Sequence, residues 1–111
     1  MKFVLTAMTV AVSAWTASTS AQDTALGAKV YADQKCAVCH SIAGKGNAKG
    51  SLDGVGSKLT ADEIREWIVD PVGMTAKAKA TRKPAMTAKY ASLPKPELDA
   101  LVTYLSSLKG K

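Results

Sequence analysis

The chain has 111 residues, a length that predicts a single domain, and carries a net charge of +6. A basic protein of this kind suits acidic partners. The sequence holds two cysteines and one histidine. With only two thiols and one imidazole, a four-coordinate structural zinc site is a weaker interpretation of these residues.

The first 21 residues have the layout of a secretory signal peptide. Lys2 begins a short basic region, residues 3–14 are mostly apolar, and residues 19–21 fit a small-x-small cleavage site. We therefore expect residues 1–21 to be cleaved off, leaving a mature domain of residues 22–111 in the periplasm. The alternative is an uncleaved anchor, although the apolar run is shorter than the roughly 20 residues of a membrane span. No membrane span is expected in the mature protein.

Export also bears on the partners and on the core. Cleavage would remove one lysine and lower the net charge from +6 to +5. An exported protein is not expected to meet nucleic acid, so acidic proteins are the expected partners of the basic surface. A mature chain of this size is marginal for a core made of side chains alone.

The stretch Cys36-Ala37-Val38-Cys39-His40 predicts the attachment site of a c-type haem. Each thiol can form a thioether with one haem vinyl group, and the imidazole can bind the iron from one face. We therefore predict one covalently bound haem c, held by Cys36 and Cys39, with His40 as an axial ligand. Because the apolar positions have no other common centre, the unmodified polypeptide is expected to be largely unfolded.

Two other interpretations of the cysteines are weaker. A thioredoxin-like redox pair would need a βαβ setting, which the pattern does not supply. A plain disulfide between Cys36 and Cys39 stays open, since exported cysteines are prone to oxidation. His40 is the only histidine, so a bis-histidine haem within one chain and a distal histidine for acid–base catalysis are both excluded.

The first predicted helix covers residues 23–35 and leads into Cys36. Asp23 or Thr24 is its expected cap. Gly27 and Tyr31 lie four residues apart and therefore share one face. The glycine-rich residues 41–57 that follow the haem motif predict a loop that wraps over the cofactor.

Thr60 and Glu63 form the sequence pattern of a capping box and predict a helix that ends at Asp70-Pro71. Trp67 on this helix is expected either in the core or beside a haem propionate. Residues 72–93 have no sustained period. The last predicted helix covers residues 97–109, enters through Pro94 without a side-chain cap, and repeats leucine and valine at helical spacing.

The second axial ligand is expected to be a methionine, because a thioether on the far face of the iron favours the ferrous state. Met1 and Met8 would leave with the signal peptide, which leaves Met74 and Met86. We favour Met86, since a loop before the last helix can fold over the open face of the haem. Met74 follows the preceding helix closely and has less chain in which to cross over.

The sequence resembles class I cytochrome c in its small, soluble bacterial form, from Ala25 to Leu108. The resemblance rests on the Cys36-x-x-Cys39-His40 motif, on Met86 in a loop before a C-terminal helix, and on the types of Gly27, Tyr31, Leu101 and Tyr104. It implies an all-α fold of three main helices and loops around one haem. It also implies that the N- and C-terminal helices pack through those four residues.

Two positions depart from the pattern of this family. The family often has Gly-Pro before the loop leucine, and the proline carbonyl accepts the other N–H of the ligand histidine. Gly50-Ser51 stands there in this chain, and the carbonyl at the Ser51 position is expected to keep that bond. Tyr31 also lies one residue further from Cys36 than is common.

The expected function is electron transfer rather than enzymatic catalysis, through a periplasmic monohaem carrier that is expected to be a monomer. The haem edge would be ringed by lysines that steer acidic redox partners, with Lys77, Lys79, Lys83 and Lys89 as the candidates. One alternative is a haem subunit dedicated to one periplasmic dehydrogenase. Another is a five-coordinate haem enzyme or gas-binding protein, in which Met86 would not bind iron.

Overall fold

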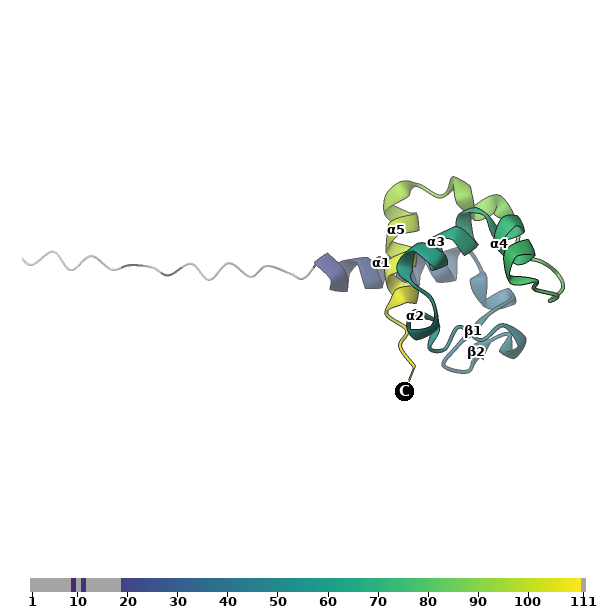
Figure 1. Cartoon of the computed structure of the whole chain (residues 1–111). Coiled ribbons are helices and arrows are strands. Elements are labelled where there is room, and N and C mark those ends of the chain that lie inside the picture. Colours follow the sequence, from purple (N-terminus) through teal and green to yellow (C-terminus); the bar gives the residue numbers. More distant parts are fainter. Residues whose placement is uncertain (1–8, 10, 12–18, 111) are drawn as a thin grey trace, which may run out of the picture.

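The computed structural model describes residues 9, 11 and 19–110 (Figure 1). The described residues form five α-helices: α1 (Thr19–Asp33), α2 (Val55–Lys58), α3 (Ala61–Val69), α4 (Pro71–Ala78) and α5 (Lys95–Ser106). Three 3₁₀ turns, η1 (Cys36–Val38), η2 (Ala48–Gly50) and η3 (Ala88–Ser92), and a short antiparallel pair, β1 (Ser41–Ile42) and β2 (Lys45–Gly46), connect them. The predicted all-α class is confirmed; α1, α3 and α5 are the three expected helices, and α2 and α4 are additional.

The first helix differs from the prediction at both ends. α1 begins four residues before the expected range of 23–35, so Asp23 and Thr24 lie within the helix and neither is its N-cap. Residues 19–22 contain no glycine or proline and therefore do not disfavour a helix. α1 also ends two residues early, because Lys35 adopts a left-handed backbone conformation (φ 57°) that leaves the helical path.

The predicted start and end of the middle helix are confirmed. At the start of α3 the Glu63 backbone N–H donates to Thr60 Oγ1 (3.2 Å), and the Thr60 N–H donates to Glu63 Oε1 (3.1 Å). This reciprocal pair satisfies two backbone donors that the first turn of a helix otherwise leaves without partners. α3 then ends at Val69, directly before Asp70.

α3 ends at Val69 and α4 begins at Pro71, although the sequence has no sustained period over residues 72–93. Pro71 occupies its first turn, where a missing N–H costs nothing, and Asp70 Oδ1 accepts a hydrogen bond from the Gly73 N–H (3.1 Å). A left-handed residue, Lys79 (φ 53°), ends this helix. Within the loop predicted at residues 41–57 the structure adds β1, β2, η2 and the start of α2.

The expected range of the last helix was 97–109. α5 begins two residues before the start of that range and ends three residues before its end. Its N-cap position holds Pro94, which makes no side-chain hydrogen bond, as predicted. Leu108, which the pattern placed in the helix, lies in the tail that follows it. The buried positions of the helix are Leu98, Ala100, Leu101, Val102 and Leu105.

α1 and α5 lie near opposite ends of the described chain, yet they cross at close range and pack together in the core (Figure 1). A Cβ on Gly27 would overlap the Ala100 carbonyl oxygen and the Tyr104 Cβ, so only glycine lets the two backbones approach. Tyr31 packs edge-on against Tyr104, with ring centroids 6.1 Å apart and an interplanar angle of 67°. Such a pair adds about 0.5–1.5 kcal/mol beyond the area it buries.

The end of the chain returns to α2 and fastens it. The Gly56 N–H donates to the Leu108 carbonyl (2.9 Å), Lys109 Nζ donates to the Gly56 carbonyl (2.8 Å), and the Gly110 N–H donates to Ser57 Oγ (2.8 Å). These three bonds hold a helix of only four residues that would be marginal by itself.

The predicted signal peptide, residues 1–21, lies largely outside the described residues. Its expected cleavage point after Ala21 falls in the first turn of α1, and it stays a prediction. Among the residues that the structure describes, none of the helices is both long and apolar enough to cross a membrane.

Replacing Gly27 by alanine tests the close crossing of α1 and α5. Alanine gains about 1 kcal/mol over glycine in a helix interior, but overpacking against a backbone oxygen costs about 1–3 kcal/mol or more. We therefore expect a net loss of unfolding free energy, measured by guanidinium titration of the haem-loaded protein. Gly110→Ala is the control, since its Cβ would meet only ordinary contacts from 3.8 Å outward and should leave the midpoint unchanged.

Candidate functional site

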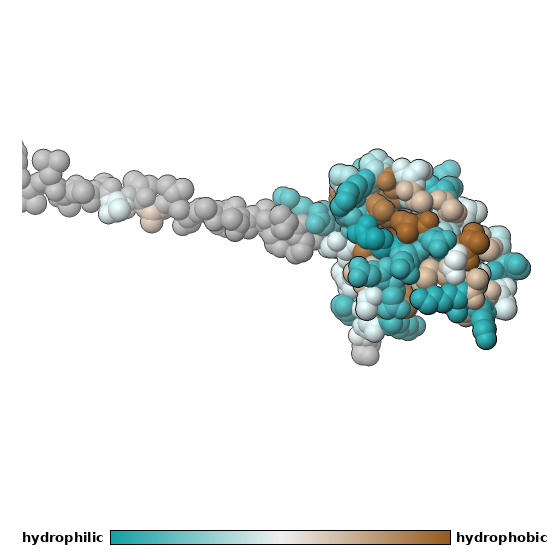
Figure 2. All heavy atoms as spheres, turned by 45° about the horizontal axis from the view of Figure 1, so that its top comes forward, coloured by the Kyte–Doolittle hydropathy of each residue, from teal (hydrophilic) through white to brown (hydrophobic). Residues whose placement is uncertain are grey.

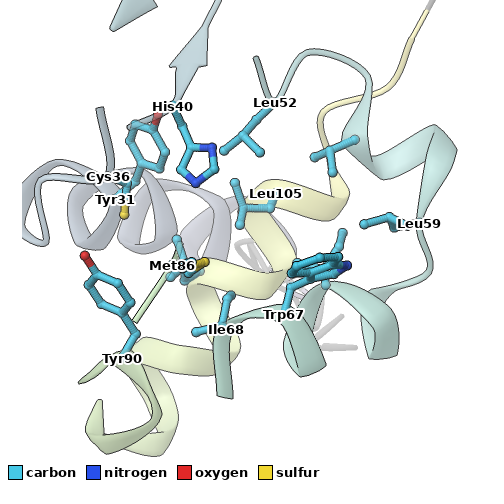
Figure 3. Close-up of a pocket in the computed structure, with 13 residues that line it drawn as sticks. Tyr31, Cys36, His40, Leu52, Leu59, Trp67, Ile68, Met86, Tyr90 and Leu105 are labelled. Atoms are coloured by element: carbon cyan, nitrogen blue, oxygen red, sulfur yellow. The ribbon is translucent and has the colours of Figure 1, made fainter. Parts of the chain in front are cut away.

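Two adjoining cavities lie beside the crossing of α1 and α5, and Figure 3 shows residues that line the first of them. The first has a volume of about 210 Å³ and the second of about 550 Å³. The residues that line both are Cys36, His40, Trp67, Met86 and Tyr90. The rest of the first cavity is hydrophobic or aromatic: Tyr31, Leu52, Val55, Leu59, Ile64, Ile68, Leu101 and Leu105.

The haem motif reaches this site because of a tight turn after α1. The left-handed Lys35 redirects the chain into η1, where the Cys39 and His40 N–H groups both donate to the Cys36 carbonyl (3.1 and 2.9 Å). The turn places Cys36 and His40 on both cavities and Cys39 on the second. The three predicted residues are therefore brought together at one wall by local backbone geometry.

His40 is oriented by a hydrogen bond from its Nδ1 to the Gly50 carbonyl oxygen, at 3.0 Å. A carbonyl can only accept, so Nδ1 carries the proton and Nε2 is the nitrogen left for a ligand. The acceptor is Gly50 and not Ser51, so the prediction was wrong by one residue. Gly50 is the last residue of η2, and this turn points the Gly50 carbonyl at the ring. Ser51, which stands where the family often has proline, follows the turn.

The electrostatic surroundings keep the His40 ring neutral. Burial lowers the pKa of His40, the bond to the Gly50 carbonyl opposes that shift, and the nearby charge of Arg82 adds to the lowering. A neutral imidazole with one bare nitrogen is the form that binds a metal ion.

The loop that carries Gly50 is fastened to the haem motif at several points. The Asn47 N–H donates to the Ala37 and His40 carbonyls (3.2 and 3.0 Å), and the Leu52 N–H donates to the Ser41 carbonyl (2.8 Å). Asn47 Nδ2 also donates to the Val38 carbonyl (3.2 Å). The hydrogen bonds thus reach the backbone both before and after His40 in the sequence, and they hold the loop against the haem motif.

The two candidate methionines have different places in the fold. Met86 lines both cavities, and its thioether and the His40 imidazole are turned toward each other across the first one (Figure 3). Met74 is 8% exposed on α4 and lines neither cavity. The structure therefore brings Met86, and not Met74, to the face opposite His40.

The cysteines are both free thiols in the structure. Burial raises the pKa of Cys36, although the positive charge of Lys89 opposes that shift. Redox-active cysteines have depressed pKa values that favour the thiolate. The site therefore does not favour a thioredoxin-like interpretation of Cys36 and Cys39.

Three aromatic side chains complete the walls. Trp67 and Tyr90 line both cavities, and Tyr31 lines the first. The Tyr31 hydroxyl is buried without a hydrogen-bond partner, and burial raises its pKa to about 12. An unpartnered hydroxyl at a cavity wall is a group that a bound molecule can satisfy.

Sequence reasoning missed Tyr90 and the contact of Arg82 with the haem motif. Both lie in residues 79–94, where no helical or strand period assigns a side chain to one face. Tyr90 stands four residues after Met86, but that spacing is informative only on a helix.

The residues present fit a c-type haem. The first cavity is lined by the Cys36 thiol, the His40 imidazole with its free nitrogen and the Met86 thioether, and the rest of its wall is hydrophobic or aromatic. The Cys39 thiol lines the second cavity, which adjoins it. Soft sulfur and imidazole ligands suit haem iron, and an apolar wall suits the porphyrin. An all-α fold around such a cavity defines a c-type haem protein.

The comparison with protein families agrees. The model of the family described as Cytochrome c matches residues 24–109, well over half of the chain. The chain therefore belongs to the cytochrome c family, which binds haem c covalently, typically one per domain, and whose members are generally electron carriers. No curated protein and no solved structure matches the chain significantly.

Trp67 offers an optical test of where the haem lies. If residues 1–21 are removed, it is the only tryptophan left, since the other is Trp15. A haem in this cavity would quench its emission by energy transfer, so emission should be weak in the folded protein and rise when guanidinium unfolds it. Strong emission from the folded, haem-loaded protein would contradict this placement.

Proposed function

We propose that this protein is a periplasmic one-electron carrier whose haem iron is bound by His40 and Met86. The observation that carries the proposal is that a histidine and a methionine face each other across one apolar cavity (Figure 3). The family match supports the coarser statement, a haem-based electron-transfer role with redox partners. The layout of residues 1–21 supports export.

Each residue has a distinct role in this proposal. Cys36 and Cys39 hold the haem through thioethers, and the Gly50 carbonyl keeps the His40 ring in one tautomer and orientation. When bound, haem c supplies an iron that gains or loses one electron. Two protein ligands leave no open position for a substrate, and the Met86 thioether favours the reduced state.

The lining of the cavities also favours a carrier over an enzyme. Neither cavity is lined by an aspartate or glutamate among the described residues. The histidine that lines them is proposed as an iron ligand, so it is not available for proton transfer. Histidine is the side chain most often used for general acid–base catalysis, and the remaining candidates among the lining residues are Tyr31, Tyr90, Lys35 and Lys89.

Conservative substitution of each methionine tests the ligand assignment. Met86→Leu should abolish the weak far-red absorption band of a methionine–iron bond in the oxidised protein and admit cyanide rapidly. Met74→Leu is the matched control and should keep the band, because Met74 lies outside both cavities. Visible spectra and cyanide-binding rates of the purified haem-loaded proteins provide both measurements.

Two results would contradict the assignment. Loss of the band in Met74→Leu, with its retention in Met86→Leu, would make Met74 the ligand. Absence of the band from the wild-type protein would indicate an open or differently ligated iron and would favour the enzyme or gas-binding function. A partner that stays bound through purification would favour the dedicated dehydrogenase subunit.

We further propose that basic residues around the second cavity steer acidic redox partners. The residues Lys77, Lys79, Lys83 and Lys89 are all exposed, and of these Lys89 lines that cavity. Lys35 and Arg82 line it as well, and Val38 beside them is 69% exposed. Figure 2 shows hydrophobic side chains between hydrophilic ones on the face that it presents.

Salt dependence with charged reagents tests this steering. Oxidation of the ferrous protein by anionic ferricyanide should slow several-fold between about 0.01 and 0.15 M ionic strength, as the Debye length falls from about 30 to about 8 Å. A cationic cobalt complex should show the opposite trend. Lys35→Gln and Lys89→Gln should each slow ferricyanide more than Lys58→Gln, whose side chain lines neither cavity. A rate that is indifferent to salt would refute steering.

A further inference from the structure

Arg82 connects two parts of the site that are far apart in the sequence. Its Nη2 donates a hydrogen bond to the carbonyl oxygen of Cys39 at 2.6 Å, across 43 positions of the chain. Cys39 directly precedes His40, so the acceptor belongs to the backbone that presents the histidine. Arg82 itself lies four residues before Met86, in the segment that presents the methionine.

The guanidinium group also lies against the second peptide that orients His40. A Cβ on Gly50 would overlap Arg82 Nη1, so the guanidinium occupies the space that a side chain at this position would fill. The Gly50 carbonyl is the acceptor for His40 Nδ1. Arg82 therefore contacts two backbone groups next to His40: it donates a hydrogen bond to the Cys39 carbonyl and packs against Gly50.

Residues 81–86 have few other polar attachments. Within residues 19–110, the bond from Arg82 to the Cys39 carbonyl is the one hydrogen bond that joins this segment to the rest of the protein. The α4 helix ends before it, at Ala78, and η3 begins after it, at Ala88. The backbone that holds Met86 is thus fixed by the packing of Met86 and by a single charged hydrogen bond.

We propose that Arg82 is a positioning residue that tethers the methionine-bearing segment to the histidine-bearing backbone. The inference rests on the proposed function, in which Met86 binds the iron. A charge-assisted hydrogen bond from a planar guanidinium is stronger and more directional than one from an ammonium group. Loss of the tether lets residues 81–86 move outward, so the thioether leaves the iron more often and competing ligands enter faster.

The test compares Arg82→Gln with Lys83→Gln in the haem-loaded protein. Both remove one positive charge from adjacent exposed positions, but the Lys83 side chain lines neither cavity. We expect Arg82→Gln to raise the rate of cyanide binding to the ferric protein by about tenfold, and Lys83→Gln to change it by less than about twofold. The cyanide-binding rate of Arg82→Lys should fall between these two, because an ammonium group can still donate to the Cys39 carbonyl but lacks the planar, forked shape of the guanidinium group.

A second measurement reports the segment itself. Backbone ¹⁵N order parameters of residues 81–87 should fall in the ferrous Arg82→Gln protein and not in Lys83→Gln, while the guanidinium unfolding midpoint changes little in either variant. The far-red band of Arg82→Gln should also be lost at a lower temperature than that of the wild type. A residue of general structural importance would instead lower the unfolding midpoint in step with these changes.

The outcomes separate the tether from the ligand assignment. If the wild type shows the far-red band but Arg82→Gln and Lys83→Gln have equal cyanide rates and equal order parameters in residues 81–87, the tether is wrong and the ligand assignment stands. If the wild type lacks the band, the role of Arg82 in positioning a ligand is overturned together with the assignment of Met86. Lower order parameters in residues 81–87 of Arg82→Gln would then show that the tether holds this segment without positioning an iron ligand.

Discussion

The close approach of α1 to α5 is the contact on which the site depends. Gly27 lets the two backbones meet, and the edge-on pair of Tyr31 and Tyr104 continues the contact toward the cavity. α1 leads directly into the haem motif, while α5 supplies Leu101 and Leu105 to the cavity wall. The same crossing therefore builds the core and sets the cysteines and the histidine against it.

The two sides of the site are held to different degrees. The histidine side is fastened by hydrogen bonds from Asn47, Leu52 and His40 itself, which tie the loop to the motif. On the methionine side, residues 81–86 have one hydrogen bond to the rest of the described chain, from Arg82. Local opening has the lowest cost where few contacts must be broken, so ligand exchange is expected on the methionine side. In the proposed carrier this asymmetry is useful, since His40 would keep the iron in place while Met86 would favour its reduced state.

The apolar wall links stability to function. The cavity is lined almost entirely by hydrophobic and aromatic side chains, and a water-filled hole of that kind contributes little to folding. A bound haem supplies the apolar surface that these side chains pack against, which is why the unmodified chain is expected to be largely unfolded. The basic residues Lys35, Arg82 and Lys89 line the second cavity and not the first, so the apolar wall carries no charge from them.

Local patterns in the sequence determined much of this protein. The haem motif of Cys36, Cys39 and His40 and the capping box of Thr60 and Glu63 each depend on residues within five positions, so their geometry follows from the backbone nearby. The helical period and the family resemblance were likewise enough to predict an all-α fold and the contact of Gly27 with the last helix.

Only the tertiary structure decided which methionine faces His40, which carbonyl accepts its N–H, and where Arg82 lies. Each of these depends on how segments 10 to 46 positions apart meet in space, and residues 79–87 have no period that assigns a face to a side chain. Two methionines and two neighbouring carbonyls are chemically equivalent in a sequence. They become different only when packing places one of each at the cavity.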